Sequence, residues 1–277
     1  MRDLLAGSFA VPRWKLWSPE TIRVVNWNID RGLRLEEILA FLESRNADIL
    51  TLQEVDLNAR RTGFRNVAEE IATQLRMNYV FGYEFQELTQ GRLGSPAYHG
   101  QATLSCWPLE NPRVMRFRQQ SNFWKPKWFL PRTEPFQPRA GGRIALVSDV
   151  NISGRRLAVY NLHLESRGDH DLRLAQLSET LDDARKYLDA QPVLLGGDLN
   201  LDLSRSYWAA RLEKMGFHSA IALPAPHTTT PRGLFRHRRT IDWVYLAGAV
   251  QSTSAAVYED VSASDHYPIS FELRFTA

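Results

Sequence analysis

The feature that most constrains the fold is an apolar run that ends in two glycines, an acid and, two residues after the acid, an amide. Residues 193–195 are Val-Leu-Leu, typical of a buried strand, and Gly196, Gly197, Asp198 and Asn200 follow. Strand ends hold side chains at fixed positions in a cleft, and residues two apart point to the same side of an extended chain. Glycines at such a point let a ligand approach the backbone closely. The acid and the amide are therefore candidates for holding a water beside a metal-bound phosphate, although Gly-Asp also starts ordinary turns.

Five further strand-like runs carry an oxygen or imidazole group at one boundary, and none of these groups is a lysine. They are Asn28 after 22–27, Glu54 after 48–53, His163 after 156–162, Asp242 within 240–246, and Asp265 with His266 before 267–275. One such boundary carries little information. Six boundaries in one chain indicate a single convergent site.

The motifs at these boundaries resemble those of the endonuclease/exonuclease/phosphatase superfamily, which includes deoxyribonuclease I, exonuclease III-type enzymes, neutral sphingomyelinases, inositol-polyphosphate 5-phosphatases and tyrosyl-DNA phosphodiesterases. They occur in the family's order, from about residue 22 to 275: Trp27-Asn28, Leu52-Gln53-Glu54, Gly197-Asp198-Leu199-Asn200, Ile241-Asp242 and Ser264-Asp265-His266. The resemblance implies an α/β fold of the deoxyribonuclease I type, a four-layer α-β-β-α sandwich of two mixed sheets. It also implies a hydrolase acting on ester bonds, a metal-dependent phosphodiesterase or nuclease.

The run around His163, Asn-Leu-His-Leu-Glu-Ser, discriminates among these relatives. It resembles the histidine motif of the deoxyribonuclease I, sphingomyelinase and tyrosyl-DNA phosphodiesterase branches, whereas abasic-site endonucleases have a tyrosine-containing motif there. The closest resemblance is to the tyrosyl-DNA phosphodiesterase and sphingomyelinase-like branch. His163 could donate a hydrogen bond to a nonbridging oxygen or protonate the leaving group. The alternative is a histidine of the core.

A metal site follows from the donor types. Asn28, Glu54, Asp198, Asn200 and Asp265 offer only oxygen atoms, and such a set selects Mg²⁺ or Mn²⁺ over zinc. By the resemblance, Glu54 is the principal ligand, with Asn28 and Asp265 nearby. The plainer interpretation of Glu54 is a surface acid that ends a strand.

The resemblance also implies roles for the remaining residues. Asp198 orients or deprotonates the attacking water, and Asn200 helps to fix it. His266 contacts the scissile phosphate, and Asp242 orients His266 through a hydrogen bond. The residues alone leave both Asp198 and His266 as candidates for the general base.

The spacing of apolar residues predicts helices near 35–42, 67–75 and 171–190. Strands are expected near 22–28, 48–54, 78–83, 100–106, 143–152, 156–163, 193–198, 240–246, 254–258 and 267–275. We interpret 22–277 as a single catalytic domain that follows an N-terminal extension, 1–21. A folded loop inserted at 109–142 is too proline-rich for regular elements and too apolar for disorder.

The inserted loop is the main indication of the substrate. It carries seven Lys/Arg and two acids, whereas the rest of the chain carries two more acids than bases. Basic side chains attract phosphates, and aromatic faces stack on bases or cover lipid. The predicted substrate-binding residues are Arg116, Arg118, Trp124, Lys125, Lys127 and Trp128, with Arg239 from a second basic stretch at 232–239.

Nucleic acid is therefore the expected substrate and partner, for a nuclease or a phosphodiesterase that processes DNA ends. A sphingomyelinase-like lipid phosphodiesterase is the alternative, with an apolar rim formed by the aromatic residues of the loop. A buried structural loop is the plainer interpretation of 109–142. A phosphatase of inositol phosphates is less favoured, because that branch's extra motifs are not found. A catalytically inert binding module is a further alternative, but every core motif is intact.

Composition excludes several other classes. One cysteine, Cys106, excludes an internal disulfide framework, and a strand-like setting favours a buried thiol over a nucleophile. No stretch suits a signal peptide or a membrane span, so no integral membrane association is expected. A cytoplasmic protein is expected, with a monomer as the default. Trp14 and Trp17 could touch a membrane surface, but packing against the sandwich is the favoured interpretation.

Overall fold

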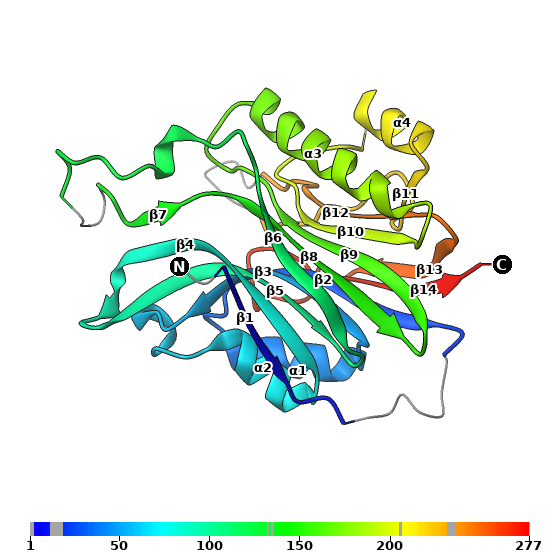
Figure 1. Ribbon diagram of the computed structural model, residues 1–277, viewed down its shortest axis with the longest axis horizontal. Helices are drawn as coiled ribbons and strands as arrows, with labels where there is room; N and C mark the ends of the chain where they lie inside the picture. The colour runs from blue at the N-terminus through cyan, green and yellow to red at the C-terminus, as the bar shows by residue number, and fades with distance from the viewer. Residues whose placement is uncertain are drawn as a thin grey trace.

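The chain folds into four layers, with two β-sheets packed face to face and helices on both outer sides (Figure 1). The computed structural model describes residues 3–11, 19–131, 133, 136–204, 207–231 and 237–276. Trp14, Trp17 and residues 232–236 of the second basic stretch lie outside these ranges. The expected α/β sandwich of the deoxyribonuclease I type is confirmed.

The first sheet is mixed and has eight strands. In spatial order they are β1 (Leu4–Ser8), β4 (Asn78–Arg92), β5 (Ser95–Ser105), β3 (Ile49–Leu57), β2 (Ile22–Arg31), β14 (Ile269–Phe275) and β13 (Val250–Val257), with β7 (Arg139–Gly141) also paired to β4. Strands β2 and β3 are parallel and the other pairs are antiparallel.

The second sheet is also mixed and has six strands. In spatial order they are β11 (Phe217–Ser219), β12 (Asp242–Ala247), β10 (Val193–Asp198), β9 (Arg155–His163), β8 (Ile144–Ile152) and β6 (Leu109–Arg116). Only β9 and β10 are parallel. Each sheet therefore has one parallel pair, β2–β3 and β9–β10. A helix follows the first strand of each pair, as a parallel connection requires.

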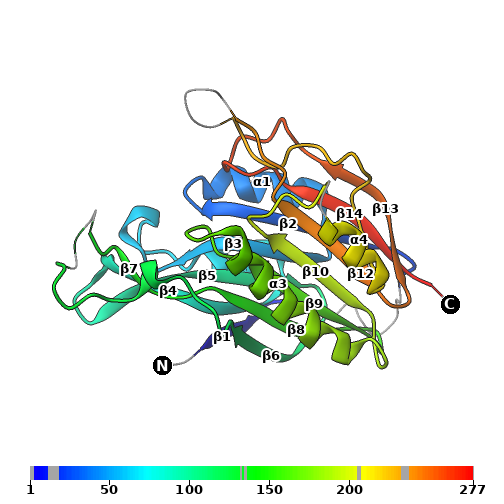
Figure 2. The same ribbon diagram turned by 90° about the horizontal axis from the view of Figure 1, so that it is seen from above.

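Helices α1 (Leu35–Arg45) and α2 (Val67–Leu75) cover the first sheet, and α3 (His170–Ala184) and α4 (Tyr207–Lys214) cover the second (Figures 1 and 2). Three short 3₁₀ helices are also present, namely η1 (Arg60–Thr62), η2 (Asn122–Trp124) and η3 (Arg185–Tyr187). Buried apolar side chains form one cluster under each helical layer and a third between the sheets. The inter-sheet cluster contains residues from both parallel pairs, including Val24 and Val159, and so fixes one sheet against the other.

Three predicted helices and ten predicted strands are present, and further strands lie in segments for which no strand was predicted. The N-terminal extension contributes strand β1 to the first sheet. The segment 109–142 is not irregular throughout, because β6 and β7 form its two ends. Strand β6 lies at a sheet edge, and its register shifts between Glu110 and Arg113, around Pro112. A proline is tolerated at such a position because no ladder hydrogen bond is lost there.

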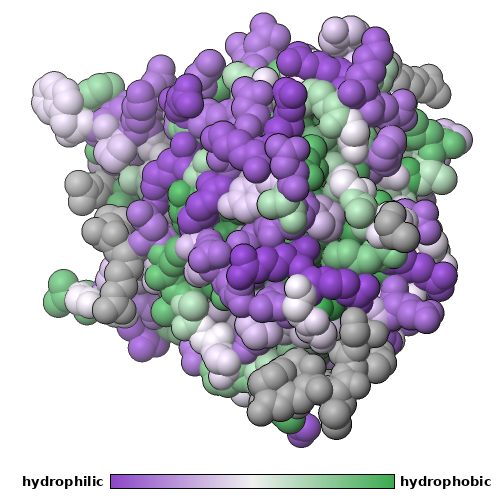
Figure 3. Space-filling view, turned by 45° about the vertical axis from the view of Figure 1, so that its right-hand side comes forward, coloured by the Kyte–Doolittle hydropathy of each residue, from purple (hydrophilic) through white to green (hydrophobic). Residues whose placement is uncertain are grey.

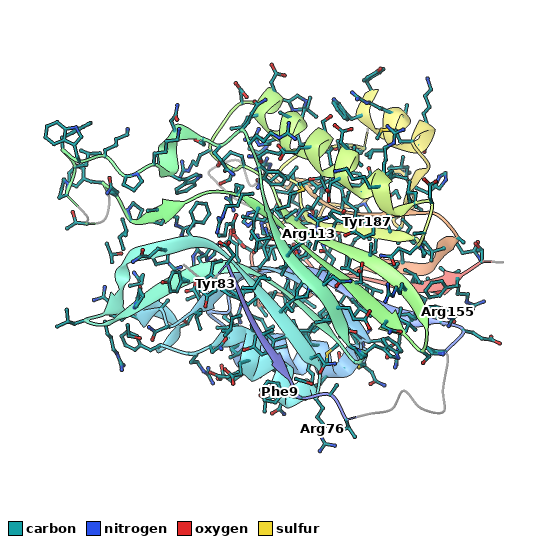
Figure 4. The ribbon with its side chains drawn as sticks, viewed as in Figure 1. Phe9, Arg76, Tyr83, Arg113, Arg155 and Tyr187 are labelled. Atoms are coloured by element: carbon teal, nitrogen blue, oxygen red, sulfur yellow. The ribbon has the colours of Figure 1, made fainter. Side chains whose placement is uncertain are left out.

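Strand β6 is also held from outside the sheet. Arg113 points toward Tyr187 below the end of α3, as Figure 4 shows, and its guanidinium donates to the Tyr187 hydroxyl at 3.5 Å and to the carboxylate of Asp183. The part of the segment between β6 and β7 leaves the body of the molecule as an arm, at left in Figure 1.

Of the two glycines of β10, Gly197 is the one that strand packing requires. A Cβ at Gly197 would lie 1.9 Å from the Leu162 carbonyl oxygen of neighbouring β9. A Cβ at Gly196 would make only an ordinary contact, 3.4 Å from the Asn26 side chain of the opposite sheet. Gly197 therefore allows β10 to lie close to β9, and so brings together the groups at the ends of these two strands.

The face in Figure 3 is mainly hydrophilic, with apolar residues scattered over it. Among the described residues, none of the helices is both long enough and apolar enough to cross a bilayer.

Candidate active site

The predicted catalytic groups meet at one end of the two sheets, around a cavity of about 490 Å³. Glu54 lines it from the first sheet, His163 and Asp198 line it from the second, and Asn200 and His266 complete this set. The convergence follows from register, because Asp198 is paired with His163 on one side and with Asp242 on the other.

Asp198, Asp242 and His266 form a buried group of two carboxylates and an imidazole. The His266 Nδ1 atom lies 2.8 Å from the Asp242 carboxylate, and its Nε2 atom lies 3.8 Å from Asp198. Burial lowers the pKa of His266, but the charges of Asp242 and Asp198 outweigh it and raise the pKa to about 9. Burial raises the pKa of Asp198 to about 6, although His266 opposes the rise. At neutral pH this group therefore holds an imidazolium beside the ionised carboxylate of Asp198.

Asn200 lies beside Asp198 through a turn and not along an extended strand. Its φ is 50°, and its backbone N–H donates to the Asp198 carboxylate at 2.9 Å. The Asn200 side-chain amide donates to the Leu164 carbonyl at 3.2 Å. The acid and the amide thus reach the same cavity, as expected, by a different backbone path.

His163 is buried between two carboxylates. Its Nε2 atom lies 3.6 Å from Asp198, and its Nδ1 atom lies 3.7 Å from Glu84. Glu84 in turn accepts a hydrogen bond of 2.7 Å from Arg143. Burial and the Arg143 charge hold the pKa of His163 well below its usual range, so this imidazole is neutral at pH 7. The two histidines of the site therefore carry different charges.

Glu54 enters the cavity from β3, at a residue whose φ is 49°. Its side chain is 21% exposed, and one carboxylate oxygen lies 3.5 Å from the Arg31 guanidinium. Burial raises the pKa of Glu54, but Arg31, His99 and His163 outweigh it and hold the pKa well below its usual range. An ionised carboxylate that faces a cavity is a suitable ligand for a divalent cation.

The other two predicted ligands, Asn28 and Asp265, are not among the residues that line the cavity. The side-chain amide nitrogen of Asn28 donates to Asp198 at 3.2 Å. The side-chain oxygen of Asn28 accepts from the backbone N–H of Asp30 at 3.1 Å. Asp265 is half-buried, and its carboxylate lies 3.4 Å from the hydroxyl of Ser264, which donates to the Asn28 carbonyl at 2.7 Å. Asn28 and Asp265 are therefore linked through Ser264, and Asn28 is paired with Gln53, the residue before Glu54. Acids and histidines grouped closely enough for one ion include Glu54 with His99 and His163, and Asp198 with Asp242 and His266. The donor types fit a divalent cation.

A polar bridge between the sheets supports the site from below, and no local sequence pattern indicates it. The Gln53 amide donates to Asn161 at 2.8 Å and to Asn26 at 3.0 Å. The Asn161 amide donates to the Leu52 and Ala102 carbonyls. Because buried amides require partners, this bridge sets the separation of the strands that carry Glu54 and His163.

The residues predicted to bind substrate divide into three groups. Arg239 and Trp124 line the cavity, whereas Arg116 pairs with Asp3 and Arg118 lies 3.9 Å from Glu179 beside α3. Lys125, Lys127 and Trp128 are exposed on the arm, and Trp128 is 96% exposed.

Trp124 anchors the arm to the site. It is only 6% exposed, and its indole N–H lies 3.0 and 3.1 Å from the two carboxylate oxygens of Glu165, two residues after His163. The cavity wall also contains cationic groups that the sequence analysis missed, namely Arg31, Arg139, Arg143 and Arg167. No local pattern marks them, because they come from separate segments.

Comparisons with known proteins agree with this architecture. Residues 25–266 match the endonuclease/exonuclease/phosphatase family. No curated protein sequence matches the chain.

Similar solved structures cover most of the chain. An endonuclease/exonuclease/phosphatase protein from Beutenbergia cavernae has a TM-score of 0.65 at 20% identity, over 94% of this chain and 72% of that one. The human Nocturnin catalytic domain, bound to sulfate, has a TM-score of 0.64 at 19% identity, over 93% and 94%. D. rerio TDP2 in complex with a single-strand DNA product has a TM-score of 0.60 at 17% identity, over 92% and 100%. At these identities the likeness shows the fold, and the family match covers most of the sequence. The chain therefore belongs to the endonuclease/exonuclease/phosphatase family, whose members are metal-dependent phosphoester hydrolases.

Proposed function

We propose that the chain is a phosphodiester hydrolase that depends on Mg²⁺ or Mn²⁺ and acts on nucleic acid. The observation that carries the proposal is the meeting of Glu54, Asp198 and the Asp242–His266 pair at one cavity. A phosphodiester repels hydroxide, so its hydrolysis needs charge neutralisation, an oriented water and a proton for the leaving oxygen. These residues offer a group for each requirement.

In this proposal Glu54 is the principal metal ligand, with Asn28 and Asp265 behind it. The ion, when bound, neutralises phosphate oxygens and charge on the leaving group. Asp198, with a pKa of about 6, is ionised at pH 7 and serves as the base that orients and deprotonates the attacking water, with Asn200 fixing that water. His266 is already protonated, so it serves as a donor to the phosphate and not as the base.

His163 is assigned a separate role from His266. Because it is neutral and faces Asp198 with its Nε2 atom, it is suited to donate to a nonbridging oxygen or to the leaving oxygen. Asp242 orients the His266 imidazole through its Nδ1 atom at 2.8 Å, whereas Glu84 lies 3.7 Å from the His163 Nδ1 atom, beyond hydrogen-bond distance. Asp242 is thus the positioning residue in this scheme.

The cationic wall supports a polyanionic substrate. Arg31, Arg139, Arg167 and Arg239 line the cavity, and Lys125 and Lys127 extend positive charge along the arm. Exposed Trp128 offers a face for stacking on a base. TDP2, one of the similar structures, holds a single-strand DNA product. We therefore assign the chain to the branch with the His-Leu-Glu motif, which includes tyrosyl-DNA phosphodiesterases.

A lipid phosphodiester is the second candidate, because the same arm is apolar at its surface. Phe123, Trp128, Phe129 and Phe136 are each more than half exposed. Such a patch could lie against lipid, with the lysines facing headgroups. An inert binding module is disfavoured because the site keeps its acids and histidines.

A substrate panel tests the proposal. Single- and double-stranded DNA, RNA, 5′-tyrosyl oligonucleotide, sphingomyelin and bis-p-nitrophenyl phosphate are incubated with Mg²⁺, with Mn²⁺ and with chelator. We expect metal-dependent cleavage of a nucleic acid that Glu54→Gln abolishes without loss of folding, whereas Glu43→Gln, at an exposed helix position, keeps full activity. Full activity of Glu54→Gln would remove the metal assignment, and cleavage of sphingomyelin alone would favour the lipid candidate.

Salt dependence tests the substrate class independently. Neutralising Lys125, Lys127, Arg167 and Arg239 to Gln should weaken DNA or RNA binding and flatten its salt dependence, by about 0.7–0.9 in the logarithmic slope for each phosphate that is no longer neutralised. Arg76→Gln, at the end of α2, is the control. An unchanged slope in the fourfold variant would contradict contact between this wall and a polyanion.

A further inference from the structure

His99 is a fully buried histidine that the proposed reaction does not use. It lies on β5 directly opposite Asp56 of β3, two residues beyond Glu54. Its Nδ1 atom is 3.0 Å from an Asp56 carboxylate oxygen. Its Nε2 atom is buried and has no hydrogen-bond partner among the described residues. A buried nitrogen without a partner costs free energy, so it indicates a missing one.

Asp56 determines which ring nitrogen of His99 carries the proton. Arg61 binds both Asp56 oxygens, at 2.7 and 2.8 Å, and so keeps this carboxylate as an acceptor. The Nδ1–H of His99 therefore donates to Asp56, and the lone pair is left on Nε2. Histidines that bind metals almost always donate their other ring N–H in this way, which fixes the ring and makes the free nitrogen more basic.

The Glu54 carboxylate lies next to this imidazole. One ligand atom from each of Glu54, His99 and His163 lies within 4.8 Å of the others. Two ligands at about 2.2 Å from a common ion are at most about 4.4 Å apart, so a small movement of one side chain closes the gap.

We propose that His99 is a nitrogen ligand of the ion that Glu54 holds, so that this site takes a first-row transition ion such as Mn²⁺ in preference to Mg²⁺. The inference rests on the proposed function, because that proposal places the ion at Glu54. The inference adds a nitrogen ligand to that ion. Mg²⁺ strongly prefers oxygen, whereas an imidazole favours transition ions. The oxygen-only set expected from the sequence is thereby replaced by a mixed set.

Two other arrangements explain the same contacts and give different results. In the first, His99 only fills the buried cluster it shares with Asp56 and Glu87. In the second, a doubly protonated His99 pairs with Glu54. Neither arrangement places a nitrogen on a bound ion.

The test is metal binding by the full-length protein, freed of metal with chelator and titrated with MnCl₂ without substrate. The amount of free Mn²⁺ is followed by its electron paramagnetic resonance signal. Pulsed measurement of the bound ion then detects coupling to a directly coordinated ¹⁴N. The variants are His99→Gln and His163→Gln, with His218→Ala, an exposed histidine on β11, as the matched control.

We expect nitrogen coupling in the wild type, in His163→Gln and in His218→Ala, and its loss in His99→Gln. We also expect His99→Gln to weaken Mn²⁺ binding by about 10- to 100-fold, while Mg²⁺ affinity, measured by competition, changes little. The absence of nitrogen coupling in the wild type, or its persistence in His99→Gln, overturns the proposal.

If His99→Gln does not fold, the proposal is tested on the wild type with ¹⁵N-labelled histidine. The label must change the coupling pattern if an imidazole is bound to the ion. A pattern that the label leaves unchanged overturns the proposal. Because no substrate is used, nitrogen coupling in a protein that cleaves nothing would refute only the proposed function. Metal-dependent cleavage by a protein without the coupling would refute only this inference.

Discussion

The pairing of Asp242 with His266 leads to a quantitative prediction for Asp242→Asn. In the folded protein the pKa of His266 is about 9, against an ordinary value of 6.5. The difference between these two pKa values corresponds to about 3 kcal/mol of preference for the imidazolium. The Asp242 carboxylate, 2.8 Å from Nδ1, is the largest contributor that raises it. An amide keeps the shape and removes the charge.

In Asp242→Asn we therefore expect the pKa of His266 to fall from about 9 toward its ordinary 6.5, because burial is then opposed only by Asp198 and Glu54. Stability should change with it. A group with a raised pKa in the folded state stabilises the fold fully below 6.5, and that contribution is lost as the pH rises through 9. The wild type should thus lose about 3 kcal/mol of unfolding free energy from this group between pH 6 and pH 10, and the variant should lose less.

Two measurements on the metal-free protein check this. Long-range ¹H–¹⁵N spectra follow the protonation of each imidazole, and urea unfolding at a series of pH values gives the stability. Asp202→Asn, an exposed acid, serves as the control for charge alone. If His266 of Asp242→Asn still titrates near pH 9, Asp198 and not Asp242 holds the imidazolium, and the reasoning about orientation is refuted.

The remaining predictions concern strand packing and the arm. Gly197→Ala should lower the unfolding free energy by about 1–3 kcal/mol in urea, because the new Cβ would meet the Leu162 carbonyl at 1.9 Å. Gly94→Ala, where a Cβ meets open space, should cost less, and equal losses would contradict the packing role. Trp124→Phe removes the indole donor to Glu165 and should cost about 1.5–3 kcal/mol while speeding proteolysis of the arm. Trp128→Phe should change neither, and identical cleavage rates in the two variants would show that Trp124 is no anchor.

Much of the fold was predictable because sheets and helices leave a local pattern. Alternating or continuous apolar runs located ten of the strands, and helical spacing located three helices. Strands β1 and β6 were not predicted, and the reason is common to both. Strands β1 and β6 lie at sheet edges and are only partly buried, so their hydrophobic pattern is weak. Their partners are far along the chain, and only the assembled sheet makes them strands.

Part of the candidate site was also predictable from local sequence patterns. His163, Asp198 and His266 stand at or near strand boundaries, and Glu54 stands inside β3 at a shift in register. Each follows an apolar run, so the chain carries this signal locally. Glu84 and His99 lie within strands, among residues with ordinary alternation, so nothing nearby distinguishes them. Their significance comes from His163 and Glu54, which face them from other strands.

Trp124 and Trp128 mark the limit of the sequence. They are four residues apart, each beside a lysine, and both were predicted to bind substrate. One is buried on Glu165 and the other is almost fully exposed. The amino-acid sequence by itself determined which chemical groups this protein has and on which strand each of them lies. The tertiary structure decided which groups become partners, because burial, charge and hydrogen bonding depend on neighbours that are distant along the chain.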